Sequence, residues 1–228
     1  MVDCVTARNG SELKASPGRR RPVAAARDVS RKPGDERWKE LLEVSASMFA
    51  MHGYAATSLQ QIADEVGMLK GSLYYYINSK EDLLYEVIKE VFTGGYENFQ
   101  ALAGQGGDAV ARLYRALEGH AVYLIENLTA TTVFLHEFER LSAERKAEFA
   151  ARDYVALVRD LIKIGQDQGG FRADLDPTLA ALSALGAINW MYRWYHPGSR
   201  APREIARELA GISVRGMLAK GYDPAQLD

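Results

Sequence analysis

The sequence predicts an all-α protein of about nine helices, with a small N-terminal helix-turn-helix domain and a larger helical domain. Three observations support this fold class. Hydrophobic residues recur at spacings of three and four along most of the chain, glycine and proline separate these segments, and no segment alternates as a strand does. At 228 residues and 47% hydrophobic content, the chain is long enough for one small and one medium domain.

Residues 1–34 are predicted to form a flexible basic tail. They hold eight lysines and arginines against three acidic residues, together with three prolines, and this composition disfavours a packed structure. The tail is either a solvated extension or, in its last part, an arm that adds phosphate contacts beside a DNA-binding domain.

Residues 35–79 are predicted to form the small domain, with two short helices joined by a tight turn near its end. The first of the two begins at Thr57 and Ser58, whose side-chain oxygens can accept hydrogen bonds from unpaired amides, and it ends at Gly67. In the second helix, Leu73 and Ile77 are four residues apart and can face the core. Polar and aromatic side chains are left for its other faces.

A helix of this kind fits the major groove of DNA, where side chains near its N-terminus reach base edges while hydroxyls and lysines hold phosphates. Lys70 and Ser72 are expected to read bases, Gly71 to let the backbone approach the DNA, and Lys80 to anchor a phosphate. The alternative is an amphipathic hairpin with half-buried tyrosines, in a helical protein-interaction module without sequence-specific DNA binding. The predicted DNA-binding residues are Thr57, Ser58, Gln60, Lys70, Gly71, Ser72, Tyr74, Tyr75, Tyr76 and Lys80.

Residues 37–84 resemble the DNA-binding domain of TetR-family transcriptional regulators, through the motifs MFAMHGY, TSLQQIADEVG and KGSLYYYINSKEDLL. The family usually carries a His-Phe or similar pair where this chain has Tyr76 and Ile77, which leaves the role of Tyr76 open. The resemblance implies a transcriptional regulator, most simply a repressor, with activator or ligand-insensitive behaviour as the alternatives. Such a protein binds a palindromic operator in double-stranded DNA as a homodimer and responds to a small hydrophobic molecule.

Residues 80–228 are predicted to form the larger, effector-binding and dimerisation domain, helical nearly throughout. Ser79 is the expected cap of a long helix over residues 80–104, which Gly94 and Gly95 should weaken. Further helices are expected over residues 109–128, 132–141, 142–168, 177–195 and 202–221, where proline and glycine mark most of the ends.

Aromatic side chains of the larger domain can enclose a ligand cavity, although aromatics at helical spacing are more often plain core. The resemblance implies that this domain binds a small effector and dimerises through its last two long helices. The predicted ligand-binding residues are Tyr96, Phe99, Tyr123, Phe134, Phe138, Arg140, Trp190 and Arg193, from a wider aromatic set that includes Phe149 and Tyr154. The apolar residues expected to supply the dimer interface are Leu179, Leu182, Leu185, Ile188, Ile205, Leu209, Ile212 and Leu218.

The C-terminal segment is similar to TetR-type regulators of fatty-acid, sterol or aromatic-acid breakdown, several of which respond to acyl-CoA thioesters. Their WYRPGG motif stands here as WYHPGS, so that His196 replaces an arginine. The similarity implies an acyl-CoA effector, with a free apolar acid as the alternative. The candidates for pairing with the phosphates of a thioester are Arg140, Arg152, Arg193 and Arg200.

Catalytic and metal-binding motifs are missing from the sequence. The four histidines are scattered, without an HExxH pair, and there is no P-loop, GxSxG or GxGxxG motif in a strand-to-helix setting. We therefore expect no enzyme activity, no metal and no cofactor. One cysteine excludes an internal disulfide framework, and no apolar run is long enough to span a bilayer, so a cytoplasmic protein without a membrane partner is expected.

Overall fold

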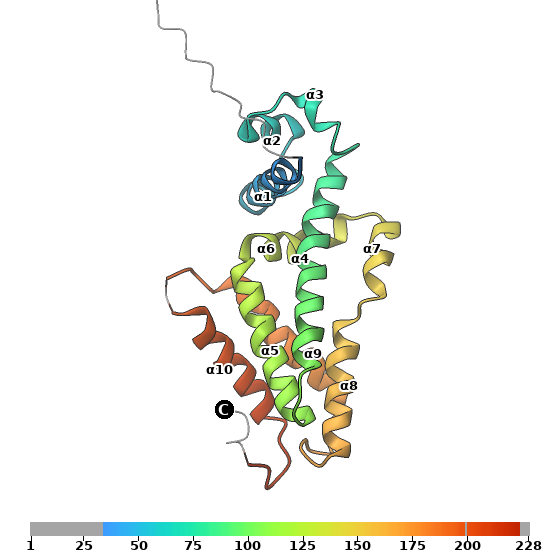
Figure 1. The fold of residues 1–228 in the computed structure, drawn as a ribbon, viewed down its shortest axis with the longest axis vertical. Coiled ribbons are helices and arrows are strands. Elements are labelled where there is room, and N and C mark those ends of the chain that lie inside the picture. The colour runs from blue at the N-terminus through green and yellow to red at the C-terminus, as the bar shows by residue number, and fades with distance from the viewer. Residues whose placement is uncertain (1–33, 199, 224–228) are drawn as a thin grey trace, which may run out of the picture. The chain divides into compact units, whose positions relative to one another are not determined.

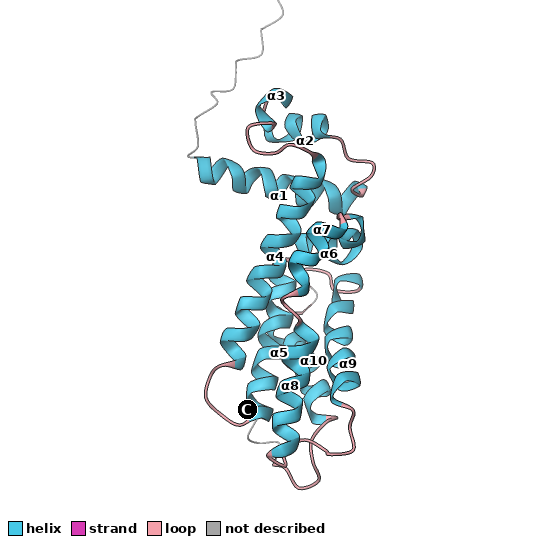
Figure 2. Ribbon diagram, turned by 90° about the vertical axis from the view of Figure 1, so that its right-hand side faces the viewer, coloured by secondary structure: helices cyan, strands magenta, loops and turns pink. Residues whose placement is uncertain are grey.

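Helices account for almost all of the regular structure in the computed structural model, which describes residues 34–198 and 200–223 (Figure 2). Within these residues there are ten α-helices, two short 3₁₀-helices and no strand; one isolated bridge joins Phe171 to Leu218. The predicted all-α fold is confirmed. The predicted basic tail lies outside the described residues, apart from Gly34, which opens the first helix.

The N-terminal helices α1 (Gly34–His52), α2 (Leu59–Val66) and α3 (Lys70–Leu73) share one hydrophobic core with the first half of α4 (Lys80–Ala103). Phe49, Ile62 and Leu73 are almost completely buried in this core. Each comes from a different helix, and their burial fixes which faces of α2 and α3 point outward.

A second core lies further along α4, among α5 (Ala109–Glu126), α8 (Tyr154–Asp167), α9 (Pro177–Asn189) and α10 (Pro202–Arg215). In Figure 1, α4 (green) leads from the N-terminal helices to this bundle. Because α4 contributes to both cores, the domain boundary predicted between residues 79 and 80 stays a prediction.

Gly94 and Gly95 lie inside an unbroken α4, although we expected them to weaken it. A Cβ atom on Gly94 would clash with the hydroxyl of Tyr123, and one on Gly95 would stand 2.7 Å from the hydroxyl of Tyr154. The two glycines therefore allow two tyrosines to pack directly against the helix, which offsets the low helix propensity of glycine.

The helix predicted over residues 142–168 is in fact two helices, α7 (Ala143–Ala150) and α8. Asp153 starts α8 by accepting a hydrogen bond from the amide of Ala156 at 3.0 Å. Between α5 and α7, the shorter helix predicted over residues 132–141 is α6 (Leu128–Glu137) followed by the 3₁₀-helix η1 (Phe138–Arg140).

The last two predicted helices end earlier than expected. The segment 177–195 forms α9 and then the 3₁₀-helix η2 (Trp190–Arg193). The last helix, α10, ends at Arg215 rather than near Gly221, because the chain after it pairs with the loop before α9: the amide of Arg172 donates to the carbonyl of Met217 at 3.0 Å. No helix among the described residues is long and apolar enough to cross a membrane.

Candidate functional site

The start of α2 is held by a capping box at Ser58. The Ser58 hydroxyl accepts from the amide of Gln61 at 3.2 Å, and the Ser58 amide donates to the Gln61 side chain at 2.8 Å. Gly67 ends the helix in the left-handed conformation, with φ of 72°. Gln60 is exposed, and its side-chain amide donates to the Asp64 carboxylate. Ser58 and Gln60 thus lie on the surface, as DNA contacts require.

Thr57 differs from the expectation. Its side chain is buried, and the hydroxyl donates to the carbonyls of Gly53 at 2.9 Å and Met48 at 3.3 Å. The hydroxyl closes the turn between α1 and α2 and neither caps α2 nor faces outward. The reason is that Ser58, one residue later, occupies the cap position.

The predicted reading residues lie on and just after α3. Leu73 and Ile77 are buried, as predicted, and this places Lys70 and Gly71 on the surface. Tyr75 is 89% exposed. The other predicted residues of this surface are Ser72, which is half-buried, and Tyr74 and Tyr76, which are exposed.

Two hydrophobic side chains of this surface differ from the prediction. Leu69, directly before Lys70, is 80% exposed, and periodicity alone did not single it out. Tyr76 stacks on Trp38 of α1, with 6.0 Å between the ring centroids, so part of its ring supports the fold. Its hydroxyl role toward DNA stays a prediction.

Lys80 does not present a free ammonium group. Its Nζ donates to the carbonyls of Tyr54 and Thr57, each at 2.8 Å, and lies 4.3 Å from the centroid of the Tyr54 ring. Burial, with the charge of Arg140 as a second cause, lowers the pKa of the Lys80 ammonium. The structure therefore corrects the expected phosphate anchor: Lys80 ties the first turn of α4 to the loop before α2.

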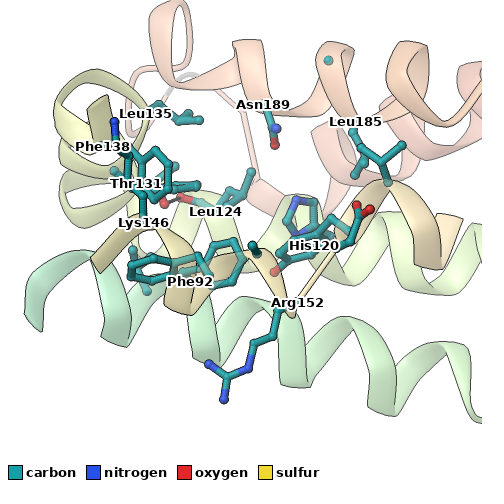
Figure 3. Close-up of a pocket in the computed structure, with 18 of the residues that line it drawn as sticks. Phe92, His120, Leu124, Thr131, Leu135, Phe138, Lys146, Arg152, Leu185 and Asn189 are labelled. Carbon is teal, nitrogen blue, oxygen red and sulfur yellow. Dashed lines mark hydrogen bonds between the residues drawn. The ribbon is translucent and has the colours of Figure 1, made fainter. Parts of the chain in front are cut away.

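A cavity of about 770 Å³ lies in the larger part of the fold and is lined mainly by apolar and aromatic side chains (Figure 3). Segments from α4 to α9 surround it. Of the eight predicted ligand-binding residues, Phe134 and Phe138 line this cavity. Its wall consists of Val91, Phe92, His120, Leu124, Thr131, Phe134, Leu135, Phe138, Glu139, Lys146, Phe149, Ala150, Arg152, Asp153, Tyr154, Val155, Leu182, Leu185, Gly186 and Asn189.

The other predicted aromatic residues lie elsewhere. Phe99 is completely buried in the second core, and Tyr96 packs its ring against Phe92 and Tyr154, one layer behind the wall. Tyr123 lines a separate hollow of about 480 Å³ between α1, α4, α5 and the start of α6. Helical spacing indicated that these residues face inward, but it did not indicate whether they line the cavity or pack in the core.

The predicted cations are mostly engaged outside the cavity. Arg140 pairs with Glu137, and Arg200 pairs with Glu208 at 2.9 Å. Arg193 and Trp190 lie against each other on the surface, with 5.8 Å between the guanidinium carbon of Arg193 and the centroid of the Trp190 ring. Arg152 is the one predicted phosphate partner in the wall. The sequence reasoning missed Lys146, Phe92, His120 and Asn189 as wall residues, and no motif in the sequence marks them.

His120 is a buried titratable residue of the cavity wall. Burial lowers its pKa to about 4, although the neighbouring Asn189 side chain, as a hydrogen-bond partner, opposes the shift. The imidazole lies against the Tyr154 ring, 4.9 Å between centroids. It is therefore neutral at pH 7.

Two polar junctions connect the cavity region to the DNA-reading helices. In the first, Arg145 of α7 forms an ion pair with Asp82 and donates to the carbonyl of Glu81 at 2.7 Å, while Tyr85 donates to Glu148 at 2.5 Å. Its neighbours in α7, Lys146, Phe149 and Ala150, line the cavity.

The second junction centres on Glu137, at the end of α6. Its carboxylate accepts from the amide of Tyr54 at 3.1 Å and pairs with Arg140. Tyr54 lies in the loop that Lys80 also holds. The two junctions thus tie α6 and α7, at the cavity, to the loop before α2 and to the start of α4.

The last helices expose an apolar face. Leu179, Leu182 and Ile212 are 67%, 50% and 73% exposed, and Trp190 and Trp194 are exposed between them in sequence. By contrast, Leu185, Ile188 and Ile205, which we expected to help form a dimer interface, are buried inside the chain. They are core residues because α9 and α10 also pack on α5.

Comparisons with known proteins agree with this arrangement. The pattern of bacterial regulatory proteins of the tetR family matches residues 41–87, and that of the tetracyclin repressor-like C-terminal domain matches residues 106–217. The crystal structure of the TetR family transcriptional regulator PfmR from Thermus thermophilus is similar, with 31% identity and a TM-score of 0.72; the match covers 77% of this chain and 97% of PfmR. The chain belongs to the TetR family.

TetR-family membership decides between the two predicted functions. The protein is a DNA-binding transcriptional regulator and not an enzyme, and it binds operator DNA as a dimer. Among the residues that the structure describes, there is no group of three or more histidine, cysteine, aspartate and glutamate side chains that could hold a metal ion.

Two further relatives of the TetR family bear on the type of regulator. The transcriptional repressor KstR2 of Rhodococcus jostii is 28% identical over 197 residues, 84% of this chain and 95% of KstR2. AibR, whose crystal structure contains isovaleryl coenzyme A and operator DNA, is 28% identical with a TM-score of 0.69, over 80% of this chain and 98% of AibR.

Proposed function

We propose that this TetR-family protein is a cytoplasmic repressor whose dimer leaves a palindromic operator when an acyl-CoA thioester enters the cavity. The observation that carries the proposal is the position of the cavity. Its wall includes α7, and α7 is bonded to the first turn of α4, directly after the reading helix. The similarity to KstR2 repressors and to AibR, solved with an acyl-CoA and operator DNA, supports the same interpretation.

The cavity suits the acyl end of a thioester. Its volume falls within the range of roughly 300–1,000 Å³ that is usual for small-molecule sites, and its wall is mainly apolar. The adenine nucleotide of the cofactor then extends beyond it. Lys146 and Arg152 are the two cationic residues of the wall, and cations of this kind pair with phosphates. In the structure, Lys146 donates a hydrogen bond to Glu139 and Arg152 donates one to the hydroxyl of Thr93. The ion pair of Lys146 with the exposed Glu139 costs little to exchange for a phosphate.

Release of the operator follows from linkage. A ligand that binds better to a dimer with wrongly spaced reading helices must weaken operator binding by the same factor. In this chain α4 acts as the lever, because it carries the reading turn before its first residue and the cavity residues Val91 and Phe92 further along.

The dimer uses the apolar face of α9, η2 and α10. The exposed hydrophobic side chains of these elements are Leu179, Leu182, Trp190, Trp194 and Ile212, and exposed apolar patches mark interaction sites. A two-fold pairing of this face buries on the order of 2,000 Å² in an obligate interface. Two-fold symmetry of the protein then requires a palindromic operator.

The test measures ligand binding and operator release together. A palindrome is first identified by selecting genomic fragments that the protein binds, and fluorescence anisotropy then follows its release. Isovaleryl-CoA and octanoyl-CoA should raise the melting temperature and weaken operator binding at least about tenfold. Free isovalerate and octanoate should do neither. If no thioester binds below about 100 μM, which is roughly −5.5 kcal/mol, the acyl-CoA assignment is wrong.

A substitution that fills the cavity, paired with a conservative one at the same position, tests whether the ligand binds there. Leu135 lines the cavity and does not belong to either buried core. Leu135→Trp should abolish the melting shift while leaving operator affinity unchanged, whereas Leu135→Met should keep both responses. Ala121, by contrast, is completely buried in the second core and outside the wall, so a tryptophan there would disrupt packing and not block the ligand.

A further inference from the structure

The imidazole of His120 has a buried nitrogen without a hydrogen-bond partner. It is the one buried side-chain polar atom in this condition among the residues that the structure describes. Nearly all buried polar groups in proteins are paired, because an unpaired one costs about 1–3 kcal/mol of desolvation. His120 is 4% exposed and lines the cavity. The imidazole ring lines the cavity while Nδ1 itself is enclosed, so that a turn of the ring would bring Nδ1 to a molecule that fills the cavity.

Two aromatic rings and one amide lie next to His120. Phe99 and Tyr154 pack their rings against the imidazole at 6.0 Å and 4.9 Å between centroids. Asn189, from α9, is the hydrogen-bonding neighbour. In Figure 3, Lys146 and Phe138 lie at one end of the cavity and His120 and Leu185 at the other, and the Arg152 side chain extends away from the imidazole. Neither Lys146 nor Arg152, the two cations of the wall, is thus directed at the imidazole.

We propose that His120 is the specificity residue of the effector cavity and that it hydrogen-bonds an uncharged oxygen, a hydroxyl or a ketone, within the apolar part of the ligand. This inference rests on the proposed function, because it names the kind of acyl group that the regulator recognises. The ligand is then an amphiphile whose charged part lies toward Lys146 and whose oxygen-bearing apolar part reaches His120.

The chemistry of the site selects against a charged group at this end. Burying a carboxylate without a cation is costly, and the imidazole is itself neutral, since its pKa is held near 4. A neutral imidazole donates through one nitrogen and accepts through the other. It can therefore pair with either a hydroxyl or a ketone, and a plain hydrocarbon chain in the same place would leave Nδ1 unpaired.

The experiment compares matched ligands that differ in one oxygen. Octanoyl, 7-oxooctanoyl and 8-hydroxyoctanoyl chains are prepared both as CoA thioesters and as methyl esters, and their affinities are measured by calorimetry and melting shifts. Wild-type protein should bind the oxygenated chains about tenfold more tightly than octanoyl, the size expected for one buried hydrogen bond. His120→Leu should lose this preference and bind octanoyl at least as well as the wild type does.

Two further variants and an NMR measurement distinguish the loss of a hydrogen bond from an effect on folding. His120→Gln keeps a hydrogen-bonding side chain and should retain part of the preference. Leu185→Met, at the same end of the cavity (Figure 3), should retain all of it. In wild-type protein labelled with ¹⁵N-histidine, the oxygenated methyl esters should shift the Nδ1 resonance of His120, and methyl octanoate should not.

Equal affinities for plain and oxygenated chains would overturn the proposal, as would an equal loss of both in His120→Leu; a water bound to Nδ1 would give the first result. Failure of every ester and thioester to bind would overturn it too. The proposed function fails separately. It fails if methyl esters bind with a His120-dependent preference while no thioester releases the operator.

Discussion

Arg145 of α7 and Asp82 of α4, 63 residues apart in the chain, form an ion pair between the wall of the cavity and the helix that follows the reading turn. The Asp82 carboxylate also accepts from the amides of Asn78 at 2.7 Å and Ser79 at 2.9 Å. Burial by itself would raise the pKa of Asp82, but the hydrogen bonds from Arg145 and these amides outweigh it and lower the pKa. The pair therefore stays ionised at neutral pH.

Replacing Arg145 should uncouple the two sites. In Arg145→Met, α7 keeps its apolar contacts but loses its bonds to Asp82 and Glu81. We expect ligand affinity and operator affinity to stay within about threefold of wild type, while release of the operator by the ligand falls at least tenfold. The free energy of unfolding should drop by about 1–2 kcal/mol.

The control for this uncoupling is Arg159→Met, which removes an ion pair with Asp160 on α8. It should leave the ligand response intact. Anisotropy titrations of operator DNA with and without ligand measure both variants. Full ligand-induced release in Arg145→Met would show that the α7 junction does not carry the coupling.

Gly71→Ala tests the close approach of DNA to the reading helix. A Cβ atom on Gly71 would meet nothing within 4 Å in the protein, and alanine favours the helix by up to about 1 kcal/mol. The melting temperature should therefore hold or rise. If the DNA backbone lies against Gly71, operator affinity should fall at least tenfold.

The matched control is Gly106→Ala, which also meets nothing within 4 Å and lies in the loop after α4. It should affect neither stability nor DNA binding. An operator affinity of Gly71→Ala equal to that of wild type would place the DNA elsewhere on the domain.

Ile212→Glu tests the dimer face. Ile212 is 73% exposed on α10, so the change should not disturb the fold of one chain, but a charge buried in an apolar interface is costly. Light scattering at micromolar concentration should report a monomer with wild-type helix content. Ile164→Glu, at a 40% exposed position on α8, should remain dimeric. A dimeric Ile212→Glu would move the interface away from this face.

His120 should make the protein less stable in acid. Its pKa is about 4 in the folded chain, below the ordinary histidine value of 6.5 that applies to the unfolded chain. The unfolded chain therefore binds a proton below pH 6.5 that the folded chain does not bind until near pH 4. The contribution of neutral His120 is complete above pH 6.5 and is lost as the pH falls, by about 3 kcal/mol in total. Tyr154, which faces the imidazole, stays protonated because burial raises its pKa.

Urea unfolding at several values between pH 7 and pH 4.5 measures this contribution. The carboxylates also titrate in part of this range, so the comparison of wild type with His120→Leu isolates the histidine. The variant should lose less stability on acidification. Parallel curves for the two proteins would mean that the folded state protonates His120 readily.

The sequence by itself determined the helix-turn-helix, because its signals are local. Ser58 and Ser79 cap their helices through residues three positions away, and Gly67 takes the left-handed conformation that ends α2. Leu73 and Ile77 reach the core at helical spacing, and this alone turns Lys70 and Gly71 outward.

Only the tertiary structure decided the cavity wall and the junctions. Periodicity places Phe99 and Phe134 on inward faces alike, but one fills the core and the other lines the cavity. His120 has no motif, and its role arises from the rings and the amide that three other helices bring around it. Lys80 was expected to meet phosphate and instead meets backbone carbonyls 23 and 26 residues earlier. Contacts between distant parts of a chain depend on how whole helices pack, and local spacing does not contain that information.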